Sequence, residues 1–140
     1  MKEYVAQRHA MSCGVACVAN VMECSYDDAM RHFDSRHADT RGYYCKNIVM
    51  ALEKFGKTYR FKKVHEEVDP LIYQEGTIAF VGPSSDLPYG YWLTRIGGEW
   101  IDPWINLTYE SNPKKATAGI RYELPGRVEW IVYDAAPIND

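Results

Sequence analysis

The sequence predicts an α+β fold in which helices come first and an antiparallel sheet follows. Up to Gly56, apolar residues recur with the period of about 3.6 that is typical of helices. After Gly56 the period changes to two, and Gly-Gly and Pro-Gly pairs separate the alternating runs. Helices followed by strands are typical of α+β domains. A length of 140 residues without a linker-like segment predicts a single domain over residues 1–140.

Helices are expected over three segments before Gly56. The run CGVACVANVMEC, residues 13–24, is apolar on nearly every face, which predicts a central, buried helix. Residues 25–33 begin with a serine followed three residues later by an aspartate, the pattern of a capping box, and predict a short helix. Residues 44–55 place apolar side chains at helical spacing before Gly56, a residue common at helix C-termini.

Strands are expected in the segments 58–64, 76–82, 89–104, 119–124 and 127–135. The third of these segments contains two strands joined at Gly97-Gly98, a pair typical of tight hairpins. The last two segments are separated by Pro-Gly, and we expect them to pair with each other.

The charge and the apolar runs exclude several classes of protein. A net charge of -3 argues against a protein that coats nucleic acid and against a polybasic membrane protein. The first residues, MKEYVAQRHAM, lack the apolar stretch of a secretory signal, and no apolar run is long enough to span a bilayer. We therefore expect a cytoplasmic protein with reduced cysteines, no membrane span and no nucleic-acid partner. The sequence makes no prediction of the oligomeric state.

Neither the cysteines nor the histidines predict a metal site. The chain has four cysteines and no Cys-x-x-Cys pair: Cys13, Cys17, Cys24 and Cys45. Cys13 and Cys17 lie four residues apart on one helical face and could be soft metal ligands, but a second ligand pair at zinc-finger spacing is missing. A polar cluster could also hold a metal, although a solvated loop is favoured there; it contains His32, Asp34, His37 and Asp39. We expect no metal and no cofactor.

Cys13 is a candidate nucleophile because it stands at the first turn of the predicted central helix. The unpaired N–H groups and positive dipole end of a helix favour a thiolate and lower the pKa of the thiol. Gly14 allows a substrate to approach closely, and Gln7, six residues upstream, can direct its amide toward an oxyanion. The alternative is that Cys13 and Cys17 are small buried residues, which is the more usual role of a free cysteine.

Gln7, Cys13-Gly14 and Ala16 together resemble the start of papain-like cysteine peptidases. The resemblance is greatest to the bacteriocin-processing peptidases, which cut leader peptides after a double glycine. It implies N-terminal helices packed on a C-terminal antiparallel sheet, a histidine on one strand, and an aspartate, often followed by proline, on the next. Asp102-Pro103 matches the aspartate of that pattern, and the resemblance extends from Gln7 to about residue 104.

This chain departs from that pattern at the general base, because Tyr91 stands where the resemblance implies the histidine. A phenol with a pKa near 10 does not take a proton from a thiol efficiently at pH 7. The order of elements predicts that Tyr91 lies across the groove from Cys13, beside Asp102 as the orienting acid. His9, four residues before Cys13, is a candidate replacement base, although its loop can also turn it toward solvent.

Two functions follow from these residues, and a third has little support. The first is a cysteine peptidase or amidase with an unconventional base. The second is an inactive pseudopeptidase that binds a peptide or a small ligand; degenerate domains of the resembled family dock substrates in exporters. We expect its binding groove to be lined by Gly14, Trp92, Trp100 and Trp104. A structural partner without a groove function is the third, and no feature of the sequence favours it.

Overall fold

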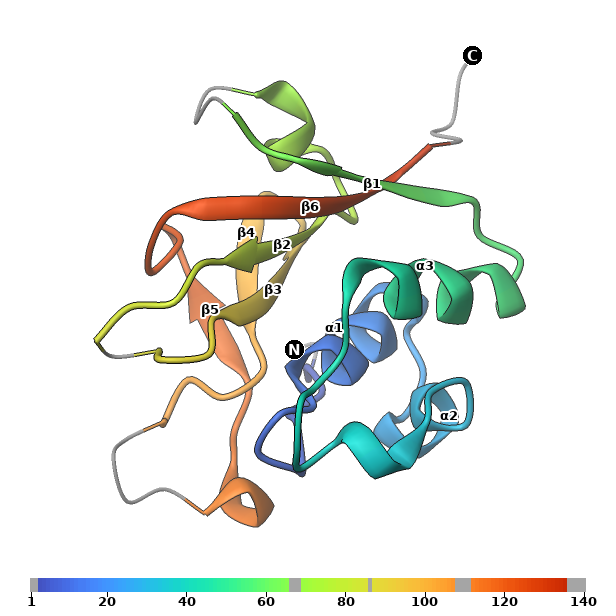
Figure 1. The fold of residues 1–140 in the computed structure, drawn as a ribbon, viewed down its shortest axis with the longest axis vertical. Coiled ribbons are helices and arrows are strands. Elements are labelled where there is room, and N and C mark those ends of the chain that lie inside the picture. Colours follow the sequence, from blue (N-terminus) through green and yellow to red (C-terminus); the bar gives the residue numbers. More distant parts are fainter. Residues whose placement is uncertain (1–2, 66–68, 86, 108–111, 136–140) are drawn as a thin grey trace.

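The computed structural model describes residues 3–65, 69–85, 87–107 and 112–135. The helices α1 (Cys13–Met22), α2 (Tyr26–Met30) and α3 (Cys45–Lys54) precede every strand. Figure 1 shows these helices gathered on one side of the sheet. The predicted order of helices and strands is therefore confirmed. Within the described residues, no helix has the length and apolar character needed to cross a membrane.

Helix α1 is the central element of the helical layer, as its apolar composition predicts. Val15, Cys17 and Val18 are completely buried, because α1 packs against β3 (Tyr91–Ile96) on one side and α2 on another. The side chain of Asn20 accepts a hydrogen bond from the backbone N–H of Val5 and donates one to its carbonyl. The segment before α1 is thereby held along the helix.

The predicted starts of α2 and α3 correspond to local hydrogen bonds, whereas α2 ends at Met30, earlier than the predicted end at residue 33. Ser25 Oγ accepts from the backbone N–H of Asp28 at 3.0 Å, which caps α2. At the start of α3, Asn47 Oδ1 accepts from the backbone N–H of Tyr44 at 2.9 Å. Gly56, just beyond α3, has a φ of +86°, a conformation in which a β-carbon would be strained.

The sheet is antiparallel and has the order β1-β6-β2-β3-β4-β5. Its remaining strands are β1 (Tyr59–Lys63), β2 (Ile78–Val81), β4 (Glu99–Asp102), β5 (Gly119–Arg121) and β6 (Val128–Asp134). Strands β3 and β4 form the predicted hairpin, in which Gly97 and Gly98 have φ values of +62° and +80°. Two positive values are what a type I′ turn requires.

The predicted pairing of the last two strands is wrong. Strand β6 lies between β1 and β2, whereas β5 pairs with β4 at the opposite end of the sheet. Gly126 lacks the positive φ of a tight hairpin turn, so the Pro-Gly segment leads from one edge of the sheet into its middle. Ile131 and Val132 on β6 are completely buried, in agreement with a strand that has a neighbour on each side.

Candidate active site

Cys13 is the first residue of α1 and lies against β3. Only 8% of its surface is exposed, and its Sγ accepts a hydrogen bond from the backbone N–H of Trp92 at 3.4 Å. A β-carbon at Gly14 would lie 3.2 Å from Ile48 Cδ1, which is a tight contact, and 3.5 Å from Trp92 Cδ1, which is an ordinary one. Gly14 therefore serves the packing of α1 against α3.

Burial reverses the pKa shift that the helix terminus predicts for Cys13. Removal from water disfavours the thiolate and raises the pKa of the Cys13 thiol to about 12. The backbone N–H groups of Trp92 and Gly14 lower this pKa, but by less than burial raises it, and the charge of Asp102 raises it further. The expected lowering is wrong, because desolvation outweighs the helix end. Cys13 is a neutral thiol at pH 7.

Tyr91 lies beside Asp102 and Gln7. Its hydroxyl lies 2.8 Å from Asp102 Oδ1 and 3.1 Å from Gln7 Oε1. Burial raises the pKa of Tyr91 well above its ordinary value, and the charges of Asp102 and Cys13 raise it further. The hydroxyl therefore keeps its proton at neutral pH and donates it. Within the described residues, no hydrogen bond joins this hydroxyl to Cys13.

Asp102 is a buried carboxylate that accepts from several donors. Besides the Tyr91 hydroxyl, its Oδ1 accepts from the backbone N–H of Trp104 at 2.9 Å. Its Oδ2 lies 2.6 Å from Arg121 Nε, in an ion pair between a 2% exposed and a 38% exposed side chain. The sequence analysis did not find Arg121. Its only local signal is a basic residue in the predicted strand segment GIRYEL, and its position depends on the pairing of β5 with β4.

Gln7 is 1% exposed and is fully engaged with its own loop. Its Nε2 donates to the carbonyls of His9 at 3.0 Å and Ala10 at 3.1 Å, which uses both amide hydrogens. The backbone N–H of Gln7 donates to the carbonyl of Pro103, beside Asp102. An oxyanion would have to displace one of the loop carbonyls before Gln7 could bind it. The oxyanion role of Gln7 remains a prediction.

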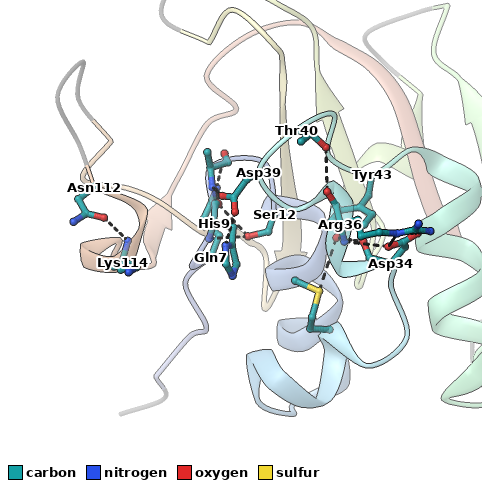
Figure 2. Close-up of polar contacts among 12 residues, drawn as sticks. Gln7, His9, Ser12, Asp34, Arg36, Asp39, Thr40, Tyr43, Asn112 and Lys114 are labelled. Carbon is teal, nitrogen blue, oxygen red and sulfur yellow. Dashed lines mark hydrogen bonds and ion pairs between the residues drawn. The ribbon is translucent and has the colours of Figure 1, made fainter.

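His9 lies at the surface, in the loop before α1. Figure 2 shows it beside Asp39, and its Nδ1 lies 3.0 Å from Asp39 Oδ2 with 43% of the histidine side chain exposed. Asp39 also accepts from the backbone N–H of Ala10. Within the described residues, no imidazole is among the groups that shift the pKa of Cys13. The structure therefore brings Cys13, Gln7, Tyr91 and Asp102 together and leaves His9 outside.

A cavity of about 460 Å³ opens next to Cys13. Its lining is mostly apolar and aromatic: Met11, Cys13, Gly42, Tyr43, Tyr44, Cys45, Phe61, Phe80, Tyr89, Gly90, Trp92 and Trp130, together with the basic Arg41 and Lys46. Of the predicted groove residues, Trp92 lines this cavity, whereas Gly14, Trp100 and Trp104 do not. Trp100 and Trp104 are 1% and 5% exposed and belong to the core.

The aromatic wall of the cavity is built by strand register. Phe80 on β2 is paired with Trp92 on β3 and with Trp130 on β6, and directly opposed residues share a face of a sheet. The ring centroids of Phe80 and Trp92 are 5.0 Å apart, and those of Phe61 and Trp130 are 6.2 Å apart. Sequence analysis missed Phe61, Phe80 and Trp130 because the place of β6 between β1 and β2 is not encoded locally.

The described part of the chain contains no cluster of His, Cys, Asp or Glu side chains that could hold a metal ion. Asp34, which the sequence grouped with two histidines, instead pairs with Arg36 and lies 3.6 Å from His37 Nε2.

No protein-family model and no curated protein matches this chain. Among solved structures, the chain is similar to the peptidase domain of Streptococcus ComA, a bifunctional ABC transporter involved in a quorum-sensing pathway. The TM-score is 0.51 at 18% sequence identity, over 96% of this chain and 99% of that chain. The two share a fold. The predicted α+β fold, with helices packed on an antiparallel sheet, is confirmed, and it matches the fold of that peptidase domain.

Proposed function

We propose that this chain is a catalytically inactive papain-like domain that binds a peptide in the apolar cavity beside Cys13. The observation that carries the proposal is Tyr91, whose hydroxyl donates to Asp102 at 2.8 Å in the position that the resemblance gives to the general base. The likeness in fold to the peptidase domain of ComA supports a relationship to peptidases.

The chemistry of peptide hydrolysis is not available to these groups at neutral pH. A cysteine peptidase needs a base that takes the thiol proton and later returns it to the leaving amine. Burial raises the pKa of the Cys13 thiol to about 12, and the phenol of Tyr91 also has a raised pKa. Neither group is ionised at pH 7, so no thiolate forms and no acceptor is ready for the proton.

The cavity supports the binding half of the proposal. Two of the aromatic side chains that line it, Tyr44 (60% exposed) and Tyr89 (72% exposed), are also accessible to a ligand from solvent. A contiguous apolar surface of this kind is typical of an interaction site. Among the described residues, the charged side chains that line it, Arg41 and Lys46, are both basic. A peptide with apolar side chains and an occasional acidic residue complements such a surface.

A slow cysteine peptidase is the second candidate, and one observation favours it. Cys13 lines the cavity, so a bound peptide would lie next to its sulfur. The N–H of Trp92 also points at that sulfur, which would stabilise a thiolate if one formed. This reading requires a base that the described residues do not place beside Cys13.

One synthetic peptide distinguishes the two candidate functions. The probe is a fluorescently labelled peptide of about 20 residues, rich in leucine, isoleucine and glutamate, with a Gly-Gly pair before a short tail. We expect saturable binding by fluorescence anisotropy and, by mass spectrometry, no more cleavage than with Cys13→Ala. Cleavage that Cys13→Ala abolishes would establish a peptidase instead. Absence of both binding and cleavage would contradict the peptide-binding proposal.

A further inference from the structure

The buried carboxylate of Asp102 pairs with the guanidinium of Arg121, whereas the resemblance implies a histidine beside this aspartate. We propose that the guanidinium of Arg121 supplies to Asp102 the positive charge that an imidazolium supplies in an active cysteine peptidase, and that Arg121 thereby keeps the site inactive together with Tyr91. This inference rests on the proposed function above, because it explains how a peptidase-like site is stable without its histidine.

The geometry of Asp102 shows why it needs a cation. A carboxylate that is 2% exposed is costly to bury unless it is both paired and hydrogen-bonded. Arg121 Nε lies 2.6 Å from Oδ2, while the Tyr91 hydroxyl and the backbone N–H of Trp104 donate to Oδ1. Within the described residues, Arg121 is the cation that pairs with Asp102. The phenol of Tyr91 provides a hydrogen bond but no charge.

The register of β5 brings Arg121 to this carboxylate. Asp102 pairs with Gly119, and Arg121 lies two residues further along β5 on the same face. Such a diagonal separation is within reach of a long side chain. The 38% exposure of Arg121 also lets its charge stay partly hydrated while it neutralises the buried aspartate.

Arg121 would also disfavour the protonation of a histidine introduced at position 91. The titratable groups that face position 91 are Asp102 from β4 and the thiols of Cys13 and Cys17 from α1. The uncharged amide of Gln7 also lies there, and Arg121 reaches Asp102 from β5. Both thiols are neutral at pH 7, since burial raises their pKa values. In Tyr91→His, a protonated imidazole would be a second cation beside one carboxylate, and the nearby guanidinium would disfavour its charge.

A double-mutant cycle of thermal stability, measured at two pH values, tests whether a charged histidine at position 91 can replace Arg121 as the partner of Asp102. Thermal midpoints are measured for the wild type, Tyr91→His, Arg121→Gln and the double variant at about pH 5.5 and about pH 8.5, which bracket the usual imidazole pKa. We expect Arg121→Gln to lose roughly 8 °C at both pH values, because a buried charge loses its partner. The double variant should regain more than half of this loss at the lower pH only, where the new imidazole is charged. Tyr91→His alone should show no such dependence.

Two further variants serve as controls for the loss of a positive charge. Arg60→Gln removes a cation from the exposed face of β1 and should change the midpoint by less than about 2 °C. Arg121→Lys keeps the charge and should lose less than half as much as Arg121→Gln, with no gain from Tyr91→His. If Arg121→Gln does not fold, the double variant should fold at the lower pH and not at the higher one.

Two results would overturn the inference. One is an Arg121→Gln midpoint within about 2 °C of the wild type, which would mean that Asp102 does not depend on the guanidinium. The other is a double variant that regains the same share of the lost thermal midpoint at both pH values. Cleavage of the probe peptide by the wild type would instead contradict the proposed function and the inactivating role of Arg121, whereas the pairing of Arg121 with Asp102 is tested by the stability measurements alone.

Discussion

Consecutive residues of β3 contribute to two unlike regions of the candidate site. Trp92 lines the cavity, which is open, aromatic and rimmed by basic side chains. Tyr91 enters a closed polar network in which Gln7 and Asp102 are 1% and 2% exposed and hydrogen-bonded within the protein. Adjacent residues of a strand point to opposite faces, so one strand can serve both regions.

The contrast between the cavity and the network separates binding from catalysis. In the cavity, apolar surface remains available to a ligand. In the network, each donor and acceptor that chemistry would use is already satisfied: the Gln7 amide by loop carbonyls, the Tyr91 hydroxyl by Asp102, and Asp102 by Arg121. We infer that changes in the network act on stability and changes in the cavity act on ligand binding.

The largest expected effect is on stability, at Asp102. Asp102→Ala leaves the Tyr91 hydroxyl and the N–H of Trp104 without their acceptor and Arg121 without its counter-charge. We expect a loss of about 3 kcal/mol in the free energy of unfolding, measured by urea denaturation. Asp27→Ala, in the first turn of α2, is the matched control. A loss below about 1 kcal/mol would mean that the network is not structural.

A smaller effect is expected on binding, at Trp130. Trp130→Ala removes one wall of the cavity, and we expect the anisotropy titration with the labelled peptide to give a dissociation constant at least about tenfold higher. Tyr122→Ala is the control, because Tyr122 is 83% exposed and does not line the cavity. Equal binding by Trp130→Ala and the wild type would place the peptide elsewhere.

The smallest effect is expected at Tyr91. Tyr91→Phe removes one donor from Asp102, which keeps Arg121 and the N–H of Trp104, so we expect a loss of about 1 kcal/mol in the free energy of unfolding. Peptide affinity should not change, because Tyr91 does not line the cavity. A tenfold loss of affinity in this variant would show that the two regions are coupled and that their separation is incorrect.

The parts of the structure that sequence reasoning could predict are local. The Ser25 cap, the end of α3 just before Gly56 and the Gly97-Gly98 hairpin each depend on a few neighbouring residues. The proximity of Tyr91 to Asp102 also follows from that hairpin, since it joins the two strands that carry them.

The parts that sequence reasoning missed depend on distant pairings. Trp130 reaches the cavity because β6 enters the middle of the sheet, and Arg121 reaches Asp102 because β5 pairs with β4. The pKa of Cys13 was expected to fall because Cys13 stands at the N-terminus of a helix, where the dipole favours a thiolate. That position can be inferred from the local sequence. Its burial by β3 and the surrounding core is non-local, and it has the larger effect.

The reactivity of Cys13 as a function of pH tests the loss of catalysis most directly. Iodoacetamide labelling of the intact protein, resolved by residue through mass spectrometry, measures the thiolate population of each cysteine. With a thiol pKa of about 12, the rate at Cys13 should rise about tenfold per pH unit from about pH 6 to about pH 9 without a plateau. At pH 7, Cys13 should react more slowly than the partly exposed Cys24. A plateau below about pH 8, or labelling of Cys13 first at pH 7, would reveal an activated thiolate and contradict the account.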